Sequence, residues 1–266
     1  MAKNDITPRA FDLYLEGQRL FSVIERKRLE QAAEKFRAAT VEAPNFARAW
    51  GHLAYCLAQI MVGGHAVQAL EATSLLNDAE GYARKAVKLD PHDYANRWDL
   101  GFVLLNQGRT KEAFAEYESA LDLFDRRTDM LERRNDLLVE MAEAHIYDGN
   151  LKRAFELLDR AVRIPDWYRW IRAWACFNAR DYRGAIDQIN SMHKRCGEEG
   201  YVPDIQLLLA ASHAHNGEPK LANEALARLK KGRPDWTLGR ELARNPFTNE
   251  ADREHWEAGM KRAGFA

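Results

Sequence analysis

The stretch LGFVLLNQGRTKEAFAEYESA, residues 100–120, contains the pattern that decides the fold. Two apolar segments each carry a small residue, Gly101 in the first and Ala113 in the second. Residues 106–109 between them contain the Asn and Gly at which helices end. Small residues let two antiparallel helices approach closely, where a bulkier side chain would overpack. The stretch therefore predicts a helix-turn-helix unit.

The same unit recurs along the chain at a fixed spacing. Twelve residues separate Gly101 from Ala113, and twelve also separate Ala210 from Ala222. A spacing that repeats in this way is typical of repeat architectures. We expect about six units, at approximately residues 10–44, 47–91, 94–127, 135–165, 166–197 and 203–234.

These units resemble the tetratricopeptide repeat (TPR) family, whose repeats are about 34 residues long. The resemblance covers roughly residues 10–235. It implies an all-α, right-handed superhelical solenoid of about six helix-turn-helix units. Residues 1–9 are then an N-terminal tail, and residues 236–266 are a C-terminal capping segment with a capping helix, because solenoids need an atypical terminal element.

Two segments depart from the regular pattern. The second unit is enlarged, since 25 residues separate Ala54 from Ala79, which places an insertion at about residues 60–77. Such insertions often lie on a binding face, although a tolerated surface elongation explains this one equally well. The charged segment 122–134 either extends a helix or links two subdomains.

The C-terminal end carries a second resemblance. Pro246-Phe247 followed by a helix that ends in the stretch EAGMKRAG, residues 257–264, looks like the end of TPR regions in bacterial adenylate cyclase-type signalling proteins. This resemblance implies a bacterial origin and a regulatory relative.

The composition argues against several kinds of partner. The 39 Lys and Arg residues balance 40 Asp and Glu residues, so no basic excess indicates nucleic acid or an anionic membrane. The sequence has no apolar stretch of about 18 residues and no signal-like start, which predicts a cytoplasmic protein. The three cysteines lack CxxC spacing and are expected to be reduced packing residues.

In the TPR family the first helix of each unit lines a concave groove that captures a peptide or helix. The resemblance places the following residues toward that groove: Tyr14, Arg48, His52, Tyr55, Trp98, Asp99, Phe102, Asn106, Glu140, Glu143, Tyr147, Trp170, Trp174, Phe177 and Asn178. Aromatic anchors beside carboxylates suit a protein or peptide partner with apolar and basic side chains. Alternatively, the tryptophans pack between helices and the charges form a solvated face.

Other kinds of site lack their required residues. The TPR proteins that clamp a chaperone's C-terminal carboxylate use Lys, Asn and Arg, but the matching positions here hold Tyr14, Gln18, His52, Ala95 and Asp99. No Walker A, GxGxxG, HExxH or GxSxG pattern occurs. We therefore expect no catalytic residues, no metal and no cofactor.

The sequence thus favours a non-catalytic scaffold or adaptor that binds a protein or peptide. One alternative is a regulatory sensor that binds a small molecule in the groove and relays its occupancy to an enzyme or transcription factor. Another is a self-assembling scaffold, because open solenoid edges can stack into a homo-oligomer.

Overall fold

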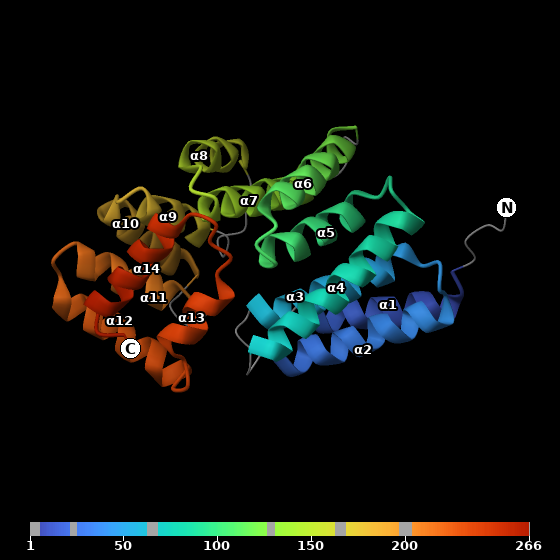
Figure 1. Cartoon of the computed structure of the whole chain (residues 1–266), viewed down its shortest axis with the longest axis horizontal. Coiled ribbons are helices and arrows are strands. Elements are labelled where there is room, and N and C mark those ends of the chain that lie inside the picture. Colours follow the sequence, from blue (N-terminus) through green and yellow to red (C-terminus); the bar gives the residue numbers. More distant parts are fainter. Residues whose placement is uncertain are drawn as a thin grey trace. The chain divides into compact units, whose positions relative to one another are not determined.

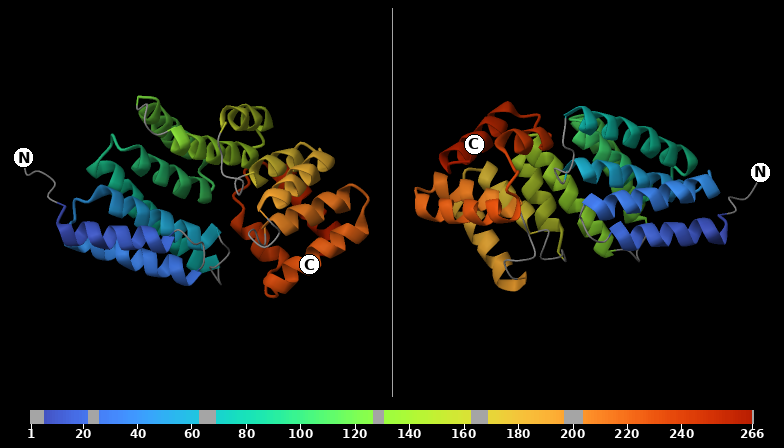
Figure 2. Two further views of the ribbon diagram at one scale, coloured as in Figure 1. Left: turned by 180° about the vertical axis from the view of Figure 1, so that it is seen from behind. Right: turned by 90° about the horizontal axis from the view of Figure 1, so that it is seen from below.

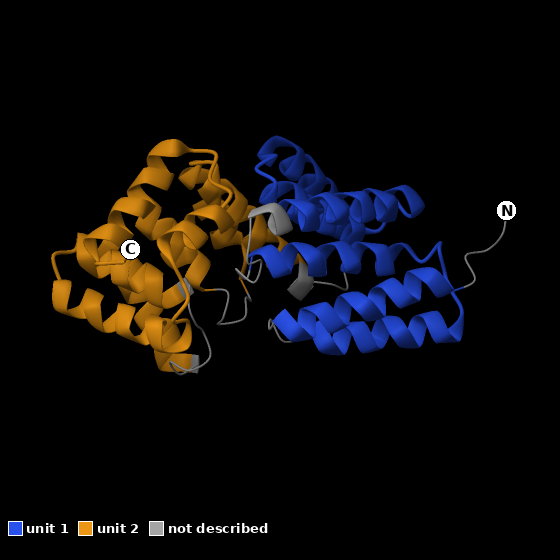
Figure 3. Ribbon diagram, turned by 60° about the horizontal axis from the view of Figure 1, so that its bottom comes forward, with its two compact units in different colours: residues 1–129 blue, residues 130–266 orange. Residues whose placement is uncertain are grey.

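The computed structural model of the chain describes residues 6–21, 26–62, 69–126, 131–162, 169–196 and 204–265. Every regular element within these ranges is a helix. The chain divides into two compact units, residues 1–129 and residues 130–266 (Figure 3). The division falls within the charged segment 122–134.

Unit 1 consists of three helix pairs. Each helix packs against the next in the chain, and the first helices of the second and third pairs also pack against each other. The pairs can be followed in Figure 1, and they are α1 (Pro8–Phe21) with α2 (Arg26–Glu42), α3 (Ala47–Val62) with α4 (Ala69–Leu89), and α5 (Tyr94–Asn106) with α6 (Thr110–Asp125).

Unit 2 adds three further pairs and two C-terminal helices, seen from two more directions in Figure 2. The helix α14 packs mainly against α11 and also contacts α9 and α13. The all-α class and the division into about six helix pairs are confirmed. The helices are α7 (Leu131–Tyr147), α8 (Leu151–Arg160), α9 (Trp170–Asn178), α10 (Tyr182–Cys196), α11 (Asp204–His215), α12 (Pro219–Gly232), α13 (Leu238–Arg244) and α14 (Glu250–Arg262).

Close helix packing accounts for the small residues of the repeat. A Cβ atom built on Gly101 would lie 2.7 Å from the Tyr117 ring, and one built on Gly17 would lie 2.6 Å from the Phe36 ring. Both rings are fully buried, so they have no room to retreat. The first helix of each of these two pairs therefore touches the second helix through its backbone.

The turns inside the pairs follow one backbone pattern. After α5, the Arg109 N–H donates to the carbonyl of Leu104 at 2.9 Å, and the intervening Gly108 has a positive φ of 73°. Gly149 and Gly217 occupy the same place after α7 and α11, with φ of 76° and 77°. Glycine adopts this left-handed conformation at no steric cost, which is why the helices end there.

Part of the predicted insertion is helical. Residues 60–62 belong to the end of α3, and residues 69–77 belong to α4. Residues 63–68 of the insertion lie outside the described residues, as do residues 1–5 of the predicted N-terminal tail.

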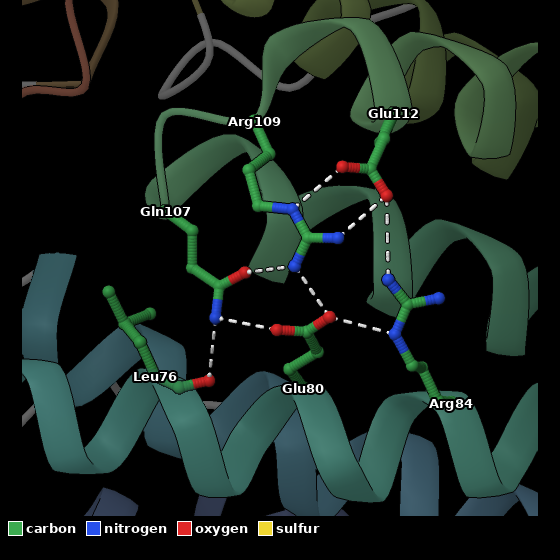
Figure 4. A network of polar contacts seen from close by, with 6 residues as sticks. All are labelled: Leu76, Glu80, Arg84, Gln107, Arg109 and Glu112. Atoms are coloured by element: carbon green, nitrogen blue, oxygen red, sulfur yellow. Dashed lines mark hydrogen bonds and ion pairs between the residues drawn. The ribbon is translucent and has the colours of Figure 1, made fainter.

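An ionic network fastens the turn between α5 and α6 to α4 (Figure 4). The Glu80 carboxylate accepts hydrogen bonds from Arg84 at 2.7 Å, Arg109 at 2.6 Å and Gln107 at 3.0 Å. Burial alone would raise the pKa of Glu80, but these donors outweigh it and lower that pKa to about 2. The second and third pairs of unit 1 are thus joined by charge as well as by apolar packing.

Candidate binding surfaces on the first helices

All fifteen predicted partner-binding residues lie on the first helix of a pair, namely α1, α3 and α5 in unit 1 and α7 and α9 in unit 2. Their exposure differs strongly. The half-buried ones are Arg48, His52, Tyr55, Trp98, Asn106, Glu143 and Trp170. The buried ones are Tyr14, Asp99, Phe102, Glu140, Tyr147, Trp174, Phe177 and Asn178. Their role in partner binding stays a prediction.

An aromatic row crosses the three first helices of unit 1. The rings of Phe21 on α1 and Tyr55 on α3 are 5.6 Å apart, and Tyr55 stacks on Phe102 of α5 at 4.4 Å. Phe21 and Tyr55 are half-buried, whereas Phe102 is buried. The row (Phe21, Tyr55, Phe102) is therefore continuous across three helices, and its accessible aromatic surface comes from Phe21 and Tyr55.

Half-buried polar groups occur on the same helices as this row. Asn106 donates from Nδ2 to the carbonyl of Phe102 at 2.8 Å, which fixes its amide one turn beyond the row. Gln18 on α1 donates to the Tyr14 hydroxyl at 3.0 Å, and Gln59 lies one turn after Tyr55 on α3. Amide groups of this kind can pair with the backbone of an extended peptide.

The predicted acidic character of the surface is weaker in the structure. Asp99 is buried, and its Oδ2 lies 3.8 Å from His52 Nδ1. His52 in turn packs against the rings of Tyr14 and Phe36. The Arg48 guanidinium pairs with Asp93, the residue that caps α5. These groups are engaged in the unit's own structure.

In unit 2, the chain's own C-terminal segment covers the predicted aromatic anchors. Trp256 of α14 meets Trp174 at 4.7 Å and Phe177 at 5.3 Å, in both cases edge to face. Phe247 meets Tyr147 at 5.1 Å. Three aromatic side chains predicted to receive a partner, Tyr147, Trp174 and Phe177, therefore contact Phe247 or Trp256 of the same chain.

Hydrogen bonds anchor the start of this covering segment to the end of α7. The Tyr147 hydroxyl donates to Asn245 Oδ1 at 2.8 Å, and the Tyr147 carbonyl accepts from the Thr248 N–H at 3.1 Å. Asn249, which caps α14, leans against Gly149 so closely that a side chain at position 149 would clash with it. Gly149 thus serves both the turn and the contact with the segment.

The helix α13 holds Asn245 in place. Its Glu241 is buried and accepts from Arg244 at 2.8 Å, from Asn245 at 2.9 Å and from the Trp236 indole at 3.1 Å. The arginine also lies over the Trp236 ring. The segment is therefore well anchored before α14 begins.

Two histidines lie where α14 meets α11. His255 stacks on His215 at 4.5 Å, and the Tyr182 ring stacks on both. Burial, aided by the positive charge of Arg180, lowers the pKa of His255 to about 4. Burial likewise lowers the pKa of His215, with help from Arg262. Both rings are consequently neutral at pH 7.

Sequence reasoning missed the covering role of Phe247, His255 and Trp256. The available signal was the density of aromatic residues in a segment interpreted as a cap. It also missed Phe21, which lies seven residues after Tyr14 and so on nearly the same helix face.

The described ranges contain no group of three or more His, Cys, Asp or Glu side chains that could hold a metal ion. None of the helices in those ranges is both long and apolar enough to cross a membrane.

The comparisons with known proteins agree with the repeat pattern. Residues 66–129 match the family model of the tetratricopeptide repeat. No curated protein sequence matches the chain.

Solved structures match over most of the chain. That of Pseudomonas aeruginosa PilF has a TM-score of 0.55 at 19% identity and covers 86% of this chain and 96% of its own. PilW, described as a type IV pilus biogenesis factor, has a TM-score of 0.58 at 18% identity, covering 85% and 95%. The APC/C hetero-tetramer Cut9–Hcn1 has a TM-score of 0.61 at 15% identity, covering 96% and 46%. These likenesses show a fold of tetratricopeptide repeat type.

Proposed function

We propose that this tetratricopeptide repeat protein is a non-catalytic scaffold or adaptor, and that it binds a peptide segment of a protein partner on the first helices of unit 1. The observation that carries the proposal is the aromatic row of Phe21, Tyr55 and Phe102. Aromatic side chains in such positions are the usual anchors of protein interfaces.

The chemistry of the row indicates the kind of peptide. Apolar side chains of the peptide would pack on Tyr55 and Phe21, while the amides of Asn106, Gln18 and Gln59 would pair with its backbone. A basic peptide has less support than the sequence predicted, because Asp99 is buried beside His52. We therefore propose an extended peptide whose apolar residues matter more than its charge.

The solved relatives support a protein partner. Cut9–Hcn1 is described as a hetero-tetramer, so in that case a fold of this type takes part in a protein complex. The cytoplasmic location, the cyclase-type regulatory resemblance, the small-molecule sensor and the self-assembling scaffold stay predictions.

The proposal can be tested with a peptide library displayed on phage and selected against the immobilised full chain. Peptides selected by the wild type should bind Tyr55→Ala and Asn106→Ala about tenfold more weakly, the usual scale for an interface anchor. Affinities are measured with synthetic peptides by calorimetry.

Two features of the design separate binding from folding. The Asn106 side chain donates to the Phe102 carbonyl within the same helix, α5, so Asn106→Ala should leave the fold intact. Glu118→Ala, at an exposed position on α6, is the matched control and should bind as the wild type does. Equal affinities for all four proteins would contradict the proposal.

A further inference from the structure

The helix α14 packs on first helices of unit 2 in the way that a bound amphipathic helix packs on its partner. Its buried residues are Asp252, Trp256, Gly259 and Met260, and its C-cap Ala263 is buried as well. Gly259, Met260 and Ala263 follow the tryptophan at spacings of three, four and seven residues. This is the spacing with which a helix anchors itself in an apolar groove of a partner. The surface beneath α14 is therefore suited to receive a helix.

Some buried polar atoms at the contact between α14 and this surface lack hydrogen-bond partners. Within the described residues, three of the buried atoms without a hydrogen-bond partner belong to rings that pack at this contact: Trp174 Nε1, His215 Nε2 and Trp256 Nε1. A buried polar atom without a partner costs free energy, because it was hydrated before burial. Docking of α14 thus leaves polar groups of the surface unsatisfied.

The approach of α14 to α11 also depends on one glycine. A Cβ atom built on Gly259 would lie 2.9 Å from His215 Nε2 and 3.1 Å from the Ala211 Cβ. The His215 ring stacks on both Tyr182 and His255, which limits its movement. A methyl group at position 259 should therefore weaken docking while favouring the helix itself.

We propose that the first helices of unit 2 form a second partner site, which takes an amphipathic helix, and that α14 is the resident occupant a partner helix displaces. The partner helix carries an aromatic anchor with a small and an apolar residue three and four positions later. It also carries a polar side chain that accepts a hydrogen bond from Trp174 Nε1, which α14 does not supply. This inference stands independently of the peptide site proposed for unit 1.

The test uses a fluorescent peptide of residues 245–265 and three full-length proteins: the wild type, Gly259→Ala and Gly239→Ala. Gly239 lies on α13 with no atom within 4 Å of its would-be Cβ, so it is the matched control. Fluorescence anisotropy measures the affinity. Because the apparent affinity scales with the fraction of open sites, Gly259→Ala should bind the peptide about tenfold more tightly than the other two.

A second measurement uses the unaltered protein. Hydrogen exchange should show the α14 amides opening about tenfold or more faster than those of α9 and α11, because the helix leaves while the unit stays folded. A peptide with Trp256→Ala should fail to bind any of the three proteins.

Four results would overturn the proposal. One is equal peptide affinity for all three proteins, and another is exchange of α14 together with α9 and α11. A third is loss of the near-UV dichroism of unit 2 in Gly259→Ala, since α14 would then be an integral part of the core. The fourth is a wild-type dimer formed by exchange of α14, since the occupant would then be a second copy of this chain.

Discussion

At the scale of the residue, Gly101 shows how the repeat depends on a missing side chain. Replacing it with alanine would improve the helix propensity of α5 by about 1 kcal/mol. The added methyl group would meet the buried ring of Tyr117, and overpacking of this kind costs about 1–3 kcal/mol. We expect Gly101→Ala to lower the free energy of unfolding, as measured by urea denaturation.

The matched control is Gly81→Ala in α4. Gly81 is exposed, and nothing lies within 4 Å of its would-be Cβ. This substitution should therefore raise the free energy of unfolding by up to about 1 kcal/mol. If Gly101→Ala stabilised the protein as much as Gly81→Ala does, the two helices of the pair would not be in backbone contact.

The low pKa of Glu80 predicts how the stability of the fold changes with acid pH. Its pKa is about 2 in the folded protein against an ordinary value of 4.5, so the ionised form is the one that stabilises the fold. The stabilisation is complete above pH of about 4.5 and is lost as the pH falls toward about 2. Glu80→Gln should be less stable than the wild type by about 1 kcal/mol at pH 7. This difference in stability should decrease as the pH falls from about 4.5 toward about 2.

Thermal unfolding followed by circular dichroism from pH 7 to pH 2.5 measures this gap. Glu118→Gln, at an exposed position on α6, provides the comparison and should follow the wild type throughout. A gap between wild type and Glu80→Gln that stayed constant with pH would show that the network does not depend on the charge of Glu80.

At the scale of the element, the packing of α14 on the rest of unit 2 should become less stable in mild acid. The pKa of His255 is about 4 in the folded protein against an ordinary 6.5, so the folded state binds fewer protons than the unfolded state between these values. Stability from the neutral ring is present above pH of about 6.5 and is lost as the pH falls toward about 4. His215 contributes in the same direction.

The groups that face His255 favour its neutral form. Arg180 and Arg262 are cations, and the Tyr182 hydroxyl lies 3.3 Å from His255 Nε2, to which it can donate only while that nitrogen is unprotonated. Asp252 opposes them, but Arg180 engages it at 3.2 Å. We expect hydrogen-exchange protection of α14 to decrease between pH 7 and pH 5, a range above the titration of ordinary carboxylates.

His255→Phe tests the assignment, because phenylalanine keeps a ring for the stack and cannot be protonated. Its α14 should lose less protection between pH 7 and pH 5 than that of the wild type. An equal loss in both proteins would place the sensitive group elsewhere.

At the scale of the whole molecule, the repeat pattern predicted the helices well and their partners less well. The spacing from Gly101 to Ala113 and the glycine turns are local features, so they identify the helix pairs directly. Burial of Trp174 and Phe177 depends on Trp256, about 80 residues later in the chain, and no repeat relates these positions. The sequence therefore identified the first helices but did not reveal which residues cover them in unit 2.

The C-terminal segment illustrates the same limit. Its helix and C-cap carry an apolar stripe of Trp256, Met260 and Ala263. Such a stripe can pack on the end of a solenoid or on the face of its first helices. Only the contacts with α11 and α9 decide between these positions. The contact between Asn249 and Gly149 could not be predicted from the sequence either, because the two residues look like an ordinary helix cap and an ordinary turn.

The order of synthesis affects when α14 can cover the aromatic surface of unit 2. The residues of α7, α9 and α11 are synthesised before residues 245–265. At a synthesis rate of roughly 5–20 residues per second, Trp256 is made on the order of seconds after Trp174 and Phe177. During that interval a nascent chain presents an uncovered aromatic surface to chaperones and to any partner already in place. A partner helix that acts during translation thus meets no competitor.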